Sequence, residues 1–221
     1  YKKMKDSYNN KKATKLIRLE EARNNKFMCD WDNDNPTKPT FEGIKYYDNI
    51  SAEEIADYID WTPFFNAWGF NNRYPQVLAH DTTKNDAQKL FDDGKSLLNQ
   101  AIKEKWFDAK ATIGFFPANS SGDDIILHNK KINLYNLRQQ IAKRGRKPNY
   151  CLSDFIAPID SGKKDWIGGF AVTAGFNVEK IGQDFADNND DYKSIMIKIL
   201  GDRIAEALAE KMHEKVRTEL W

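Results

Sequence analysis

Apolar residues recur at helical spacing over two long stretches of the chain. One helix is predicted between residues 85 and 106, where apolar side chains repeat every three to four positions, at Leu90, Phe91, Leu97, Leu98 and Ile102. A longer helix is predicted from about residue 190 to residue 220, where the same period runs through Ile195, Ile199, Ile204, Leu208 and Met212.

Two short helices are predicted before these. Ser51 and Glu54 form a capping box, which starts a helix that ends near residue 60. The Thr-Pro pair at 62–63 starts another, because Pro is favoured in the first turn after a capping Thr. Seven aromatic residues fall between residues 58 and 74, so the break between the two helices lies among aromatic rings.

Strands are predicted in the middle of the chain, at 111–116, 125–127, 132–134 and 166–174, with a turn-rich segment at 117–123. The first three are expected to form a hairpin or meander. Helices lie at both ends and there is no regular strand-helix-strand alternation. The predicted class is therefore α+β, with a mainly antiparallel sheet packed with long helices.

Residues 1–40 are mostly polar, apart from a short helical patch at 15–23. They contain too few apolar residues to build a core, so we expect an arm that lies over another part of a longer protein. The domain that contains the core is expected to begin at about residue 41.

The charge balance excludes some classes of partner. The 221 residues include 34 Lys and Arg against 33 Asp and Glu, a net charge of +1, so no overall field draws the protein to nucleic acid or an anionic membrane. No run approaches the roughly 20 apolar residues that span a bilayer, and no signal peptide is evident. The expected location is the cytoplasm.

Common signatures of metal and catalytic sites are missing. Cys29 and Cys151 stand far apart outside any CxxC pair, and the histidines His80, His128 and His213 are isolated. No catalytic or metal-binding residue is predicted. The basic cluster at 144–147 could contact phosphates, although a solvated turn is the favoured interpretation.

Asp60 lies between Ile59 and Trp61, at the break before the second short helix. A carboxylate among aromatic rings needs a cation or several hydrogen-bond donors. Two interpretations remain equal: Asp60 bonds the backbone of the next helix, or it binds a ligand.

Glu206 is the second candidate. Seven residues advance a helix by about 700°, close to two turns, so Ile199, Glu206 and His213 share a line on the last helix. An exposed Glu206 is favoured by helical geometry, and a partly buried one would need a cationic partner. Together Asp60 and Glu206 suggest an aromatic-walled groove for a small cationic ligand.

A series of motifs resembles the activation domain of cobalamin-dependent methionine synthase, in family order over about residues 41–221. They are YIDWTPFF at 58–65, GFFPAN at 114–119, GDDI at 122–125, LRQQ at 137–140, NYCLSDF at 149–155, DDY at 190–192, DRIAEA at 202–207 and HE at 213–214. The resemblance makes residues 1–40 the linker from a preceding cobalamin-binding domain. It makes 41–221 the N-terminal two-thirds of the activation domain, because the family pattern continues past Trp221.

The resemblance implies a role in methionine biosynthesis, as part of a methyltransferase. In that family an electron from flavodoxin or an equivalent reductase, followed by methyl transfer from S-adenosylmethionine, restores cobalamin that has become oxidised. The domain binds S-adenosylmethionine and works with a cobalamin-binding domain. By the motif match Asp60 and Glu206 would face S-adenosylmethionine, and the isolated chain is expected to be inactive alone.

Two alternatives remain. The chain could be a non-catalytic docking module whose basic turn at 144–147 binds a flavodoxin-type redox partner. It could also be an RNA-binding module, which the neutral net charge argues against.

Overall fold

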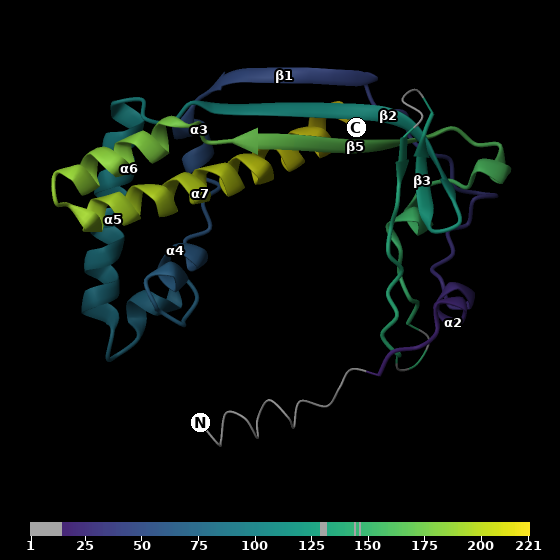
Figure 1. Ribbon diagram of the computed structural model, residues 1–221, viewed down its shortest axis with the longest axis horizontal. Helices are drawn as coiled ribbons and strands as arrows, with labels where there is room; N and C mark the ends of the chain where they lie inside the picture. Colours follow the sequence, from purple (N-terminus) through teal and green to yellow (C-terminus); the bar gives the residue numbers. More distant parts are fainter. Residues whose placement is uncertain (1–14, 129–131, 144, 146) are drawn as a thin grey trace. The chain divides into compact units, whose positions relative to one another are not determined.

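The computed structural model describes residues 15–128, 132–143, 145 and 147–221. The chain forms two compact units (Figure 1). Unit 1 combines the chain up to Glu42 with Phe115–Gly168, and unit 2 combines Gly43–Gly114 with Gly169–Trp221. No helix in the described part of the chain is long and apolar enough to cross a membrane.

The strands form one five-stranded sheet in the order β1-β2-β3-β4, with β5 also paired to β2. Strand β2 pairs antiparallel with β3, and β3 pairs antiparallel with β4. The predicted α+β class with an antiparallel sheet is therefore confirmed, whereas β1 was not predicted. The bounds are β1 Gly43–Ile50, β2 Ala109–Ser121, β3 Asp124–Leu127, β4 Ile132–Leu134 and β5 Asp165–Thr173.

The predicted turn at 117–123 is wrong over most of its length, because β2 continues to Ser121. Its polar side chains form hydrogen bonds with a segment of the same chain at residues 156–157. The Asn119 side-chain amide donates to the Ala157 carbonyl at 2.9 Å, and the Ser120 hydroxyl donates to the Ile156 carbonyl at 2.9 Å. Asn and Ser indicate a turn when they bond locally, and here they bond residues distant in sequence.

In unit 1 the described part of the polar arm packs against residues 115–168. Ala22, on helix α2 (Leu19–Asn24), is completely buried, and the Asn25 side chain donates to that of Asn149 at 2.7 Å. Short 3₁₀ helices η2 (Leu152–Phe155) and η3 (Ile159–Ser161) complete the unit. The boundary at residue 40 and the linker role of residues 1–40 stay predictions.

Unit 2 is mainly helical. Helix α7 contacts α3, α4, α5 and α6, and Figure 1 draws the strands of this unit above α7 and α4 below it. The two long predicted helices are confirmed as α5 and α7, whereas α6 was not predicted. The bounds are α3 Ala52–Ala56, α4 Thr62–Ala67, η1 Gln76–Ala79, α5 Lys84–Lys103, α6 Asn177–Asp187, α7 Asp191–Lys215 and the terminal π-helical turn η4 Val216–Leu220.

A close approach between α4 and α5 centres on Phe64, which is completely buried. A β-carbon added at Gly94 would lie 2.7 Å from the end of the Phe64 ring. Only glycine lets the backbone of α5 come this near to the ring, so Gly94 explains why a helix-weakening residue stands inside a long helix.

Candidate ligand-binding site

Asp60 lies at the break between α3 and α4. Its Oδ1 accepts a hydrogen bond from the Thr62 backbone N–H at 2.8 Å, and the residue is exposed. Helix α4 begins at Thr62, and Trp61 occupies the N-cap position without a side-chain cap bond. The prediction that Thr62 itself caps the helix is therefore wrong, and the bond to its N–H comes from Asp60. The first interpretation of Asp60, a bond to the next helix, is present in the structure.

The aromatic residues beside Asp60 mostly form a core. The Trp61 ring meets Phe64 and Phe91 edge-on, with centroid distances of 5.2 and 4.9 Å. Phe64 and Phe65 are completely buried. These rings pack against one another, so they give Asp60 a rigid support rather than the groove walls that the sequence suggested.

Glu206 lies on an exposed side of α7. Its side chain is 67% exposed and accepts two hydrogen bonds from the Arg203 guanidinium, at 2.7 and 3.0 Å. Ile195, one of the apolar residues expected on this face, is 51% exposed. The exposed alternative for Glu206 is thus confirmed, and Glu206 has a cationic partner as well.

Helix α3 is fixed to the C-terminal part of α7. Lys211 pairs with Glu54 at 3.2 Å, and the Tyr58 hydroxyl donates to the Glu214 carboxylate. The hydrogen bond to Glu214 raises the pKa of Tyr58.

The end of α4 contacts the opposite end of α7, where the rings of Trp68 and Tyr192 lie 5.1 Å apart. Since Tyr58 and Trp68 touch α7 near its two ends, the segment between them runs along the middle of that helix. Asp60 belongs to this segment and Glu206 to the middle of α7. The structure therefore puts the two carboxylates on neighbouring elements of unit 2, each with a different hydrogen-bond partner.

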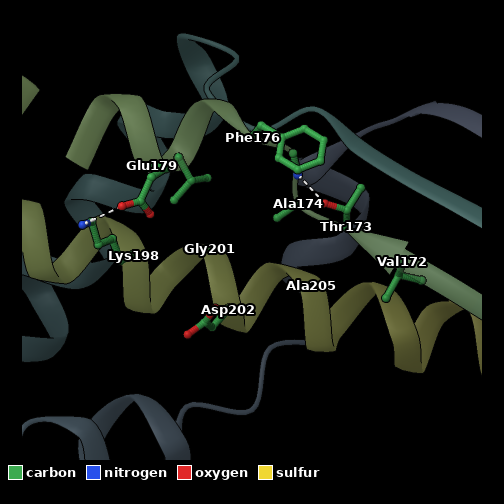
Figure 2. A pocket seen from close by; sticks show the side chains of 11 residues that line it. Val172, Thr173, Ala174, Phe176, Glu179, Lys198, Gly201, Asp202 and Ala205 are labelled. Carbon is green, nitrogen blue, oxygen red and sulfur yellow. Dashed lines mark hydrogen bonds and ion pairs between the residues drawn. The ribbon is translucent and has the colours of Figure 1, made fainter. Parts of the chain in front are cut away.

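A cavity of about 500 Å³ lies at the end of β5, between α6 and α7. Figure 2 shows the ion pair between Glu179 and Lys198 on one side of it, and Phe176 on another. Neither Asp60 nor Glu206 is among its lining residues. Sequence reasoning missed this cavity because it missed α6, although apolar and small residues there follow a helical period, at Val178, Ile181, Gly182 and Phe185.

The two cysteines form hydrogen bonds with backbone carbonyl groups. The Cys29 thiol donates to the Asp154 carbonyl and the Cys151 thiol to the Asp123 carbonyl, each at 3.4 Å, and burial raises the pKa of Cys29. Within the described ranges, no three His, Cys, Asp or Glu side chains gather as metal ligands. In the basic cluster at 144–147, Arg144 and Arg146 lie outside the described residues.

Residues 51–221 match the family described as "Vitamin B12 dependent methionine synthase, activation domain". The chain belongs to this family, as its motifs indicated. A solved structure titled "Crystal Structure of the MetH Reactivation Domain bound to AdoHcy" is similar, with a TM-score of 0.86 and 41% sequence identity. The alignment covers 94% of this chain and 65% of that chain, so the present chain spans slightly less than two-thirds of its length.

Proposed function

We propose that this chain is the S-adenosylmethionine-binding part of a methionine synthase activation domain, acting in the reductive remethylation of oxidised cobalamin. The observation that carries the proposal is the 41% identity, over 94% of the chain, to the MetH reactivation domain solved with bound AdoHcy. AdoHcy is what S-adenosylmethionine becomes when it gives up its methyl group.

Asp60 and Glu206 are the proposed ligand contacts. S-adenosylmethionine carries a sulfonium and an ammonium, and carboxylates attract both. Both side chains are exposed and therefore accessible. Asp60 has its second oxygen available in addition to the one that bonds Thr62, since a carboxylate offers about four lone-pair sites.

This role requires no general acid or base from the chain. The sulfur–methyl bond breaks as the methyl carbon bonds to the acceptor, and the positive sulfonium becomes a neutral thioether. Cobalamin, if held by another domain of the enzyme, would supply the nucleophile in its reduced form. The residues of this chain would bind the nucleoside, orient the methyl group and exclude water, which lowers the entropic cost of the transfer.

The proposed partners are a cobalamin-binding domain of the same enzyme and a flavodoxin-type electron donor. The basic cluster at 144–147 is our candidate contact for the donor, because flavodoxin-type proteins are acidic and opposite charges speed association. Reversing the charge of Arg144 and Arg146 should weaken that association at low salt and have less effect at high salt. Equal affinity for flavodoxin would remove this cluster from the docking surface.

Calorimetric titration with S-adenosylmethionine tests the site. Asp60→Asn and Glu206→Gln should each weaken binding about tenfold, because each removes a charged hydrogen-bond acceptor without changing its shape. The matched controls are Asp57→Asn and Glu210→Gln, which neutralise exposed carboxylates on the same two elements. Equal affinity in both test variants would remove Asp60 and Glu206 from the site.

A further inference from the structure

Arg203 has no role in the proposed function, yet its guanidinium bonds both carboxylate oxygens of Glu206. Its Nη1 donates to Oε2 at 2.7 Å and its Nη2 donates to Oε1 at 3.0 Å. The Arg203 side chain is only 11% exposed, whereas that of Glu206 is 67% exposed. A largely covered cation thus occupies both oxygens of an accessible carboxylate.

The position of Arg203 follows from helical periodicity. Tyr192, Arg203 and Glu214 are separated by intervals of 11 residues, and each interval makes three turns to within about 20°. The three side chains therefore share one line along α7, with Arg203 at the midpoint.

The α3–α4 segment contacts both ends of this line, through the Trp68 ring at Tyr192 and the Tyr58 hydroxyl at Glu214. Arg203 consequently lies along the course of the segment that carries Asp60, in agreement with its low exposure. Glu206 lies about 60° around the helix from Arg203. Arg203 therefore lies on the side of α7 that follows the Asp60 segment, and it reaches Glu206 on the adjoining side.

We propose that Arg203 masks Glu206 until a ligand binds and competes for it with the cationic groups of S-adenosylmethionine. This inference rests on the proposed function. An ion pair three residues apart on a helix surface is weak, so a bound ammonium can replace the guanidinium. Arg203 also opposes the charged sulfonium more than the neutral thioether, so it limits the preference for S-adenosylmethionine over S-adenosylhomocysteine.

The test compares Arg203→Met with the unchanged protein by calorimetry, using both nucleosides at low and high salt. Met keeps the aliphatic stem and removes the charge. We expect S-adenosylmethionine to bind roughly three- to tenfold more tightly, S-adenosylhomocysteine to gain less, and the salt dependence to become steeper. Arg203→Lys, which keeps the charge without the paired geometry, should fall between the two.

The double variant Arg203→Met, Glu206→Gln separates masking from a general change in charge. If Arg203 acts by covering Glu206, most of the gain disappears when Glu206 is neutral. Unchanged or weaker binding in Arg203→Met, together with weaker binding in Glu206→Gln, overturns the masking role and leaves the proposed function intact. If neither Glu206→Gln nor Asp60→Asn changes the affinity, the proposed site itself is overturned. Thermal unfolding of each variant confirms that it is folded.

Discussion

Asp60 accepts a hydrogen bond from the Thr62 backbone N–H at 2.8 Å, so its carboxylate satisfies a donor in the first turn of α4. Helix N-termini carry unpaired N–H groups and a partial positive charge. Asp60 is therefore held in place before any ligand arrives. The structural and ligand-binding interpretations of this residue are compatible, because a cap uses only part of the acceptor capacity of a carboxylate.

Two substitutions at Asp60 should separate these roles. Asp60→Ala removes the acceptor and should lower the free energy of unfolding by about 1 kcal/mol, whereas Asp60→Asn keeps an acceptor and should change it by only a few tenths. Urea unfolding measures the difference in the free energy of unfolding, provided that its dependence on urea concentration has the same slope in both variants. Equal loss of stability in the two variants would show that charge, rather than the cap bond, stabilises α4.

The sequence contains enough information for the elements that depend on local pattern. The two long helices follow from their apolar period, and the start of α4 near Thr62 follows from the Thr-Pro pair. The exposure of Glu206 also follows from helical geometry. Its partner was not predicted, although Arg203 lies three residues earlier, at the spacing that brings two side chains together on a helix surface.

The missed strand and the packing of the polar arm depend on contacts that are remote in sequence. Strand β1 contains Lys45 and Asp48 without clear alternation, so its pairing with β2 decides its structure. The polar arm packs because Arg23 and Asn25 find partners about 100 residues or more away, at Asp123 and Asn149. Propensity cannot predict such pairs, since tertiary contacts override it.

A buried ionic cluster holds unit 1 together. Arg138 donates to both oxygens of Asp154, at 2.8 and 2.6 Å, and the two side chains are 1% and 3% exposed. Arg138→Met should cost about 3–5 kcal/mol, because it leaves a buried carboxylate without its cation. Chemical unfolding measures the loss. In the control Lys38→Met, which breaks the exposed pair with Glu42, the loss should stay below about 1 kcal/mol; equal losses would contradict the burial argument.

Gly94→Ala tests the close approach of α5 to Phe64. Alanine alone would favour the helix by about 1 kcal/mol, but its β-carbon would lie 2.7 Å from a completely buried ring. Displacing a packed ring costs about 1–3 kcal/mol, so we expect a net loss of stability and a lower melting temperature. Gly169→Ala is the control, because no atom lies within 4 Å of its added β-carbon. A more stable Gly94→Ala would mean that the ring can move at little cost.

The acid sensitivity of unit 1 should depend on Asp123. Burial alone would raise its pKa, but hydrogen bonds from Arg23 and Arg138 outweigh this and hold the pKa below its usual value. A carboxyl with a lowered pKa in the folded state stabilises that state above its unfolded pKa, about 4. That contribution is lost as the pH falls through the folded value.

Asp123→Asn should therefore be less stable than the unchanged protein near neutral pH, because it lacks the charge that both arginines bind. The difference should shrink as the pH falls from about 5 toward 2, since acid neutralises Asp123 in the unchanged protein too. Thermal unfolding across this range measures both curves. A difference that stays constant down to the lowest pH would show that the pKa of Asp123 is the same in the folded and unfolded states. Other carboxyls would then govern the acid transition.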